Sequence, residues 1–334
     1  MAGQSLIYSN ARVKAMENSL LTSEKITRMA YSDSLVDAVK ILYESSYGGG
    51  MTLDNPYIYT ELLKAEEKRV ADFVREAMPD KSGLETLLTV NDYHNAKSYL
   101  KAKFEKDLDI SLMLLPEGNI EPAVIEECIQ KEDYSKLPED MATAIKNIET
   151  VAKEGSISPR YIDITLDKAM YKDILAACKK AKVKSVTKYW LANIDFINVS
   201  TLLRCKRIDA DISFLKENLI AGGEINDYIL EGLYKESFDI IAEKLKYTTI
   251  GEIIVVGVNE VKSGKALVEY EVLWDNYLLN IFKEERADVF SVAPIAGFYI
   301  AKKIEIKMVR MILTCLKNRA NLQEIKARLR GFYA

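Results

Sequence analysis

The sequence of 334 residues has few of the residues that interrupt helices, with only 7 prolines and 15 glycines. Leu, Ile, Ala, Lys and Glu are plentiful instead, and this composition favours α-helices. Apolar residues make up 49% of the chain and charged residues 29%, which is typical of a globular protein and not of a disordered one. We therefore predict an all-α protein, long enough for one large core or for two to three smaller ones.

Histidine and cysteine, on which much enzyme and metal chemistry depends, are also scarce. His94 is the only histidine, so any Ser-His-Asp or Cys-His catalytic site would have to use it. The cysteines are far apart and form no Cys-x-x-Cys pair, which makes a zinc site improbable: Cys128, Cys178, Cys205 and Cys315. We predict buried, reduced cysteines, as in a reducing cytoplasm, and no metal or other cofactor.

The chain lacks an excess of basic residues and a long hydrophobic run. With 46 Lys and Arg against 50 Asp and Glu, the net charge is −4, which argues against a nucleic-acid binder that depends on a generally basic surface. A local basic patch remains compatible with this charge. The most apolar run, residues 250–258, contains Gly251, Glu252 and Gly257 and is shorter than the roughly 20 residues of a membrane-spanning helix. We predict neither a transmembrane span nor a secretory signal.

One short pattern occurs three times along the chain. In each copy an acidic residue is followed three positions later by Asn or Met: Asp92 and Asn95, Asp195 and Asn198, Glu305 and Met308. A leucine stands eight positions after each acid: Leu100, Leu203 and Leu313. The acids recur at nearly equal intervals of a little over one hundred positions, which is too long a period for a solenoid of short repeats. Such a period suits three copies of a domain-sized helical unit.

The copies predict three helices, each with an apolar stripe that begins at the acid. Positions 0, 3, 4, 7, 8 and 11 of each copy share one helix face. We expect these helices to begin near Asn91, Asn193 and Gly297, so that each acid meets the positive end of a helix dipole, worth roughly 0.3–1 kcal/mol. This structural role is favoured over catalysis, although the three acids could also converge on one axis as an active site, a lining or an interface.

Glycines after each copy divide the chain into units. Gly118, Gly223 and Gly331 follow the acids of their copies at nearly the same spacing. We predict helical units at 1–118, 119–223 and 224–334 within one body, with pseudo-threefold symmetry. The sequence leaves open whether the units close into a ring or stack in a row.

An ordered set of residues over the whole length resembles the C subunit of archaeal and bacterial A/V-type rotary ATPases, the counterpart of the d subunit in the eukaryotic vacuolar enzyme. The set comprises residues 8–14 (YSNARVK), 47–49 (YGG) and 91–95 (NDYHN), together with Leu100, Lys103, Asp195, Asn198, Lys206, Tyr299, Glu305, Val309 and Arg310. The chain departs from the family pattern at Lys14, Ser200 and Met308.

The resemblance implies a funnel-shaped body of three similar three-helix units without catalytic activity. It implies a socket between the axle of the soluble catalytic head (D- and F-type subunits) and the membrane proteolipid rotor ring, peripheral on the cytoplasmic face. Four cations are candidates for contacts with these partners: Arg12, Lys14, Lys97 and Arg310. Two other hypotheses are a helical scaffold of a soluble complex and an enzyme with the three acids on one axis.

Overall fold

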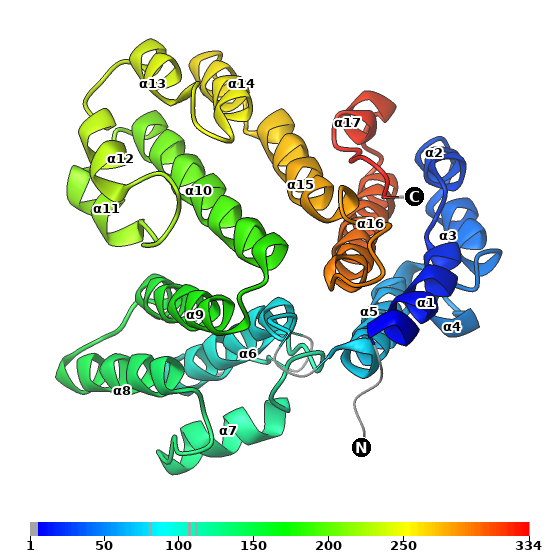
Figure 1. Ribbon diagram of the computed structural model, residues 1–334, viewed down its shortest axis with the longest axis horizontal. Helices are drawn as coiled ribbons and strands as arrows, with labels where there is room; N and C mark the ends of the chain where they lie inside the picture. Colours follow the sequence, from blue (N-terminus) through cyan, green and yellow to red (C-terminus); the bar gives the residue numbers. More distant parts are fainter. Residues whose placement is uncertain (1–5, 80–81, 106–107, 111–112, 334) are drawn as a thin grey trace. The chain divides into compact units, whose positions relative to one another are not determined.

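The computed structural model of the protein describes residues 6–79, 82–105, 108–110 and 113–333. Every regular element in these ranges is a helix, which confirms the predicted all-α class (Figure 1). Contacts between residues divide the chain into two compact units, Met1–Asp80 with Ala242–Ala334, and Lys81–Ile241. The three predicted units with boundaries near residues 118 and 223, and their pseudo-threefold funnel, stay predictions.

The first unit combines both ends of the chain. Its helices are α1 (Leu6–Met16), η1 (Glu17–Ser19), α2 (Ser23–Ala30), α3 (Leu35–Tyr43), α4 (Tyr47–Gly50), η2 (Pro56–Ile58), α5 (Thr60–Ala77), α14 (Gly251–Lys262), α15 (Val268–Lys283), α16 (Ala293–Lys317) and α17 (Leu322–Lys326). Helix α16 packs against α1, α2, α3, α5, α15 and α17, so it is the centre of this unit.

The sequence of α16 explains this central place. Pro294 stands in the first turn, where its missing N–H costs nothing, and most of the following side chains are apolar. Val309, Ile312 and Leu313 are fully buried in one hydrophobic cluster with residues from α2, α3 and α5. A helix that is apolar on more than one face needs cover on several sides, and both ends of the chain supply it.

The second unit is built on two long helices, α9 (Pro159–Ala181) and α10 (Lys184–Arg207). The others are α6 (Thr86–Phe104), α7 (Pro122–Lys131), α8 (Glu139–Glu154), α11 (Ile212–Asn218) and α12 (Asp227–Leu233). Helix α9 packs against α6, α8 and α10, and α10 packs against α11 and α12. Helix α13 (Phe238–Leu245) spans the point in the sequence where the two units divide.

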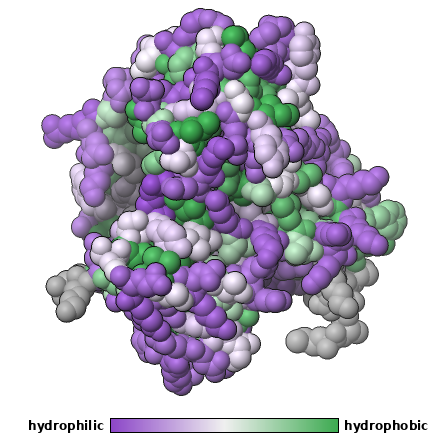
Figure 2. Space-filling view, turned by 90° about the vertical axis from the view of Figure 1, so that its left-hand side faces the viewer, coloured by the Kyte–Doolittle hydropathy of each residue, from purple (hydrophilic) through white to green (hydrophobic). Residues whose placement is uncertain are grey.

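The visible surface is mainly hydrophilic, with separate hydrophobic patches between polar side chains (Figure 2). Among the described residues, no helix combines the length and the apolar character that crossing a bilayer requires.

Candidate functional site

The three repeated acids lie inside long helices and not at their amino ends, so the predicted helix starts are wrong. Asp92 lies beyond the first turn of α6, which begins at Thr86. Asp195 and Glu305 lie near the middle of α10 and of α16. The helix dipole acts only over the terminal turn and therefore does not explain these acids. All three side chains are buried.

In the first two copies the buried acid binds the backbone that follows the helix. Asp92 Oδ1 accepts from the Ile120 N–H at 2.9 Å, and Asp92 Oδ2 accepts from Asn119 Nδ2 at 3.0 Å. Asp195 Oδ1 accepts from the Ile225 N–H at 3.0 Å, and Asp195 Oδ2 accepts from the Glu224 N–H at 3.1 Å. We call each acid with its backbone partner an acid clasp.

The residue three positions later forms a second link in the same copy. Asn95 Nδ2 donates to the Leu115 carbonyl at 2.7 Å, and Asn95 Oδ1 accepts from the Leu115 N–H at 2.8 Å. Asn198 makes the same pair of bonds with the backbone of Ile220, at 2.8 and 2.9 Å. An amide side chain carries both a donor and an acceptor and so imitates a neighbouring strand. The Asp and Asn of each copy thus fix one loop at two points.

The glycines predicted from spacing are explained by the same contacts. A methyl group at Gly118 would overlap the Asp92 carboxylate, and one at Gly223 would overlap the Asp195 carboxylate. Any side chain there would push the backbone off its acid. The third copy differs, because the Gly331 N–H donates to Asn276 Oδ1 at 2.7 Å and not to the repeated acid.

The acid of the third copy takes its partner from the other end of the chain. Glu305 Oε2 accepts from the Leu21 N–H at 2.5 Å, across 284 positions of sequence. Met308, in the place of Asn, accepts the Arg330 N–H through its sulfur at 3.3 Å. The third copy therefore keeps both links in altered form.

The position of the clasped N–H is the same in all three copies. Each of these residues directly precedes the residue that caps the next helix. Leu21 precedes the cap of α2, Ile120 the cap of α7, and Ile225 the cap of α12. Each acid therefore holds the segment that leads into a helix, and for the third acid that segment is near the amino terminus. Sequence spacing could not reveal this closure, because Leu21 precedes all three copies.

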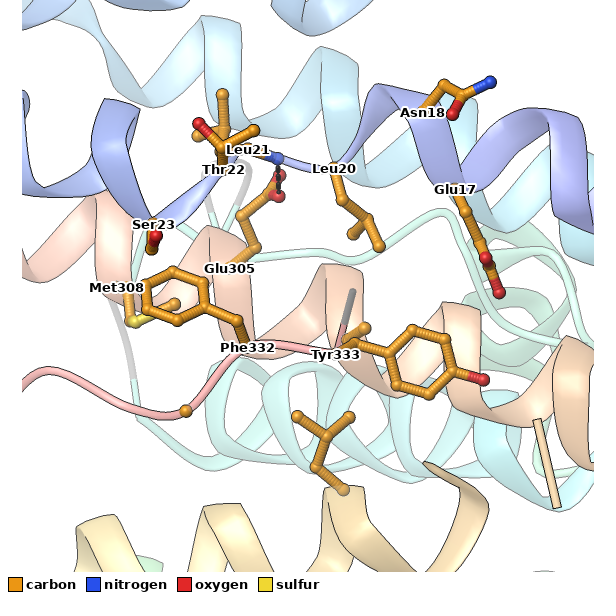
Figure 3. A pocket seen from close by; sticks show the side chains of 13 residues that line it. Glu17, Asn18, Leu20, Leu21, Thr22, Ser23, Glu305, Met308, Phe332 and Tyr333 are labelled. Atoms are coloured by element: carbon orange, nitrogen blue, oxygen red, sulfur yellow. Dashed lines mark hydrogen bonds between the residues drawn. The ribbon is translucent and has the colours of Figure 1, made fainter. Parts of the chain in front are cut away.

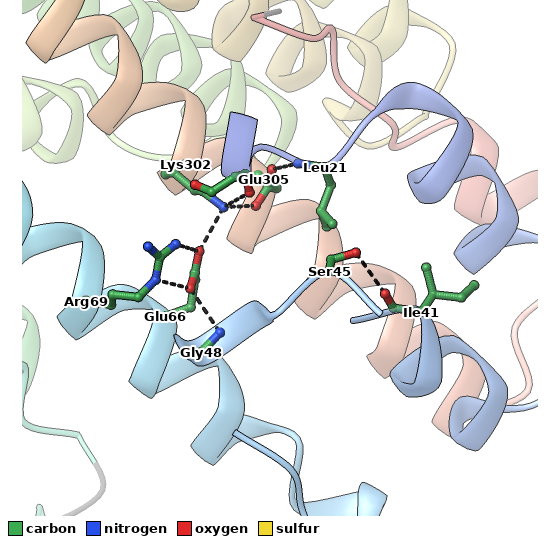
Figure 4. Close-up of polar contacts among 9 residues, drawn as sticks. Leu21, Ile41, Ser45, Gly48, Glu66, Arg69, Lys302 and Glu305 are labelled. Carbon is green, nitrogen blue, oxygen red and sulfur yellow. Dashed lines mark hydrogen bonds and ion pairs between the residues drawn. The ribbon is translucent and has the colours of Figure 1, made fainter. Parts of the chain in front are cut away.

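A buried network of charges surrounds the third clasp (Figure 4). Lys302, which is fully buried, bridges Glu305 and Glu66 at 2.8 Å each and donates to the Ser19 carbonyl at 2.7 Å. Arg69 forms two further hydrogen bonds to Glu66, and the Tyr47 ring lies 5.1 Å from Lys302 Nζ. Two cations thus face two carboxylates inside this unit.

Burial and pairing act in opposite directions on the acids. Burial raises the pKa of Glu305, although Lys302 and the Leu21 N–H act against it. Burial would also raise the pKa of Glu66, but the bonds and charges of Arg69 and Lys302 outweigh it and lower that pKa. Burial raises the pKa of Asp195 to about 6, against the two backbone N–H groups that it accepts.

The four cations proposed from sequence as partner contacts all form ion pairs within their own unit. Arg12 pairs with Glu76 at 2.9 Å, and Lys14 pairs with Glu17 at 2.7 Å. Lys97 pairs with Asp167 at 2.5 Å, and Arg310 pairs with Glu67 at 3.1 Å. Their role toward partners stays a prediction, and Lys14, whose side chain is 64% exposed, is the most accessible of the four.

A cavity of about 460 Å³ adjoins the third clasp (Figure 3). It lies between the segment that carries Glu17 and Leu21, helix α16, and the chain end at Phe332 and Tyr333. Glu17 is held by Arg286 at 2.6 Å, and Glu305 is occupied by its clasp. The carboxylates on this wall are therefore engaged in holding the chain ends.

The cysteines and His94 do not form part of a metal site in the described ranges. Within those ranges no group of three or more His, Cys, Asp or Glu could hold a metal ion. Cys128, Cys178 and Cys205 are free and buried, as predicted, and Cys315 is free and half-buried. His94 Nε2 lies 2.9 Å from the Met113 carbonyl, in a local contact at the helix surface.

Comparison with known proteins gives one consistent result over nearly the whole chain. The sequence model of a family described as ATP synthase (C/AC39) subunit matches residues 9–328. The C subunit of the A-type ATP synthase of Pyrococcus horikoshii is 26% identical, over 96% of this chain and 88% of its own length. The C subunit of the V-type sodium ATPase of Enterococcus hirae is 20% identical, over 97% of this chain and 98% of its own.

Proposed function

The chain belongs to the ATP synthase (C/AC39) subunit family, whose members are non-catalytic subunits of rotary ATPases, and on that premise we propose that it is the socket of the rotor. In this proposal the protein receives the axle of the soluble catalytic head, formed by D- and F-type subunits, and rests on the membrane proteolipid ring. It lies on the cytoplasmic face and passes torque between ATP chemistry and proton or sodium transport.

The observation that supports this role best is the match over residues 9–328, since it leaves no large part of the chain outside the family. The clasps fit a torque-bearing part. Each ties the start of one helix to the interior of a long helix through a buried hydrogen bond, and loss of the acceptor would leave the backbone N–H unpaired at a cost of about 1–3 kcal/mol. Such bonds resist the sliding of helices, which a body under torque must also resist.

An enzyme with the three acids as its active site is disfavoured. Asp92, Asp195 and Glu305 are buried, and their carboxylate oxygens accept hydrogen bonds from backbone or side-chain donors. A catalytic carboxylate needs a substrate within hydrogen-bond reach. The remaining alternative, a helical scaffold of a soluble complex, shares the fold and differs only in its partners.

A pull-down from detergent-solubilised membranes separates the two roles. We expect tagged full-length protein to recover the proteolipid ring and the axle subunits, each identified by mass. Recovery of neither, with a bait whose helical circular dichroism shows that it is folded, would contradict the socket and favour the scaffold.

A coupling assay tests the torque role itself. Complexes that are reassembled without this chain should hydrolyse ATP in the detached head but pump no ions, and adding the chain should restore pumping. Restored assembly without restored pumping would count against torque transfer.

A further inference from the structure

The turn between α9 and α10 carries an unusual concentration of positive charge. Five lysines lie close together in sequence there: Lys179, Lys180, Lys182, Lys184 and Lys188. No acidic residue occurs between Asp173 and Asp195, although the chain as a whole has a net charge of −4. All five lysines are exposed. We call this group the lysine turn.

The lysine turn is not neutralised in the way that other surface lysines are. Many exposed lysines pair with a carboxylate three or four positions away, as Lys68 does with Asp72 and Lys131 with Glu127. None of the five has an ion pair with a carboxylate of the described ranges. Glu85 acts electrostatically on the buried thiol of Cys178, next to Lys179, and helps to raise its pKa. Among the described residues, the turn is thus a group of like charges without ion-paired carboxylates.

Helix stability explains only part of the group. Lys179 and Lys180 lie in the last turn of α9, where cations complement the negative end of the dipole. Lys184 lies at the opposite pole, in the first turn of α10, where a cation is unfavourable, and Lys188 lies in the second turn, where the dipole gives it no support. That helix end has no acidic residue in its first turn and no side-chain cap. Lys182 has φ 56°, at a left-handed cap that glycine favours.

The composition of the turn fits a fluid anionic surface better than a protein partner. Lysine is depleted from protein–protein interfaces, and their energetic centres are Trp, Tyr and Arg. Residues 174–188 contain none of these three types, and Tyr189 and Trp190, which follow directly, are half-buried and buried. Lysine acts as a mobile point charge and needs no fixed bidentate geometry. At physiological salt the Debye length is about 8 Å, so this local charge acts independently of the distant net charge.

We propose that the lysine turn binds a membrane surface through anionic phospholipid headgroups. This contact is separate from the protein contacts of the socket and does not depend on them. Each lysine that reaches the headgroups is expected to raise the partition coefficient about fivefold. A lipid contact at this point would hold the protein near the bilayer with little resistance to lateral movement.

Vesicle co-sedimentation of the full chain tests the proposal. The protein is mixed with vesicles of phosphatidylcholine alone, or of phosphatidylcholine with phosphatidylglycerol, at low and at high salt. We expect binding only to the phosphatidylglycerol vesicles, and loss of that binding at high salt. A variant with all five lysines replaced by Gln should bind at least tenfold more weakly.

The matched control removes the same charge from lysines that are already paired. It carries K40Q, K68Q, K131Q, K172Q and K246Q, whose partners are Asp37, Asp72, Glu127, Asp140 and Glu243. Both variants have a net charge of −4 − 5 = −9, and circular dichroism checks their folding. The control should keep most of the binding.

Three results would overturn the proposal. The wild type could ignore phosphatidylglycerol at low salt, the turn variant could bind as the wild type does, or the control could lose as much binding as the turn variant. If vesicle binding is absent and the turn variant alone fails to join the rotary complex, the lysine turn is a protein contact and the lipid proposal is wrong.

Discussion

At the scale of single residues, Asp92 and Asp195 show how one short motif can hold a loop. The carboxylate takes the N–H ahead of the next helix, and the Asn three positions later takes a backbone pair in the loop. Three positions along a helix bring both side chains to one face. The motif therefore acts as a two-point clamp that depends on hydrogen bonds to the backbone and on the close approach of that backbone.

The first prediction concerns the charge of Asp195. Its pKa is about 6 in the folded protein and 3.8 in the unfolded chain, so the folded state binds the proton more tightly. The protonated carboxyl group of Asp195 contributes about 3 kcal/mol to the free energy of unfolding below pH 4. This contribution is lost as the pH rises through 6. Asp195→Asn should remove this slope and leave one N–H without an acceptor, at a cost of about 1–3 kcal/mol at pH 4, and loss of the buried charge should offset this cost at neutral pH.

Urea unfolding at a series of pH values measures both effects. The difference in unfolding free energy between wild type and variant should change between pH 4 and 6 and stay constant above. A variant that keeps the wild-type slope in that window would show that another group is responsible.

The second prediction concerns the close approach at the glycines. Gly223→Ala should cost about 2–3 kcal/mol, because the methyl group displaces the backbone from Asp195 and leaves buried polar groups unpaired. Gly232→Ala is the control in the same unit, since no atom lies within 4 Å of its new methyl group and alanine favours the helix. Urea unfolding measures both variants. If the two substitutions lower the urea midpoint of unfolding equally, the role of the clasp is contradicted.

At the scale of elements, α16 differs from α6 and α10 in where its acid finds a partner. Asp92 and Asp195 bind segments that follow their helices, whereas Glu305 binds Leu21 before α2. Lys302 joins this contact to Glu66 on α5. Helix α16 therefore links both ends of the chain through a buried network as well as through its apolar face.

The third prediction tests that network. Lys302→Met leaves Glu66 and Glu305 buried with one cation fewer, and we expect a loss of about 3–5 kcal/mol of stability. Lys303→Met, at the neighbouring and partly exposed position, should change stability by less than about 1 kcal/mol. Thermal unfolding compares the two variants, and similar midpoints would show that the buried charges do not stabilise α16.

At the scale of the whole molecule, the chain forms one unit from a continuous segment and one from its two ends. The second unit, Lys81–Ile241, is one continuous segment, so its internal contacts all form within that segment. In the first unit, α16 comes from the carboxyl-terminal part and is covered by α2, α3 and α5 from the amino-terminal part. We therefore expect the continuous segment of the second unit to fold alone, and either end of the chain not to fold without the other.

The fourth prediction follows from this division. A fragment of residues 81–241 should be helical and unfold cooperatively, because its own helices cover α9 and α10. A fragment of residues 242–334 should lack a cooperative transition, because the buried face of α16 would be exposed. Circular dichroism during urea unfolding measures both, and a cooperative transition in the second fragment alone would refute the argument.

The sequence by itself determined the helical class, the three copies and the importance of the glycines after them, because composition, periodicity and spacing are local properties. It also contained an overlooked signal that α6 and α10 extend further toward their amino ends, since no proline or glycine lies between Thr86 and Asp92 or between Lys184 and Asp195. The tertiary structure alone decided which partner each acid takes. Leu21 and Glu66 reach Glu305 and Lys302 only because α16 packs between both ends of the chain, and a buried charge bonds to whatever donor the packing places beside it.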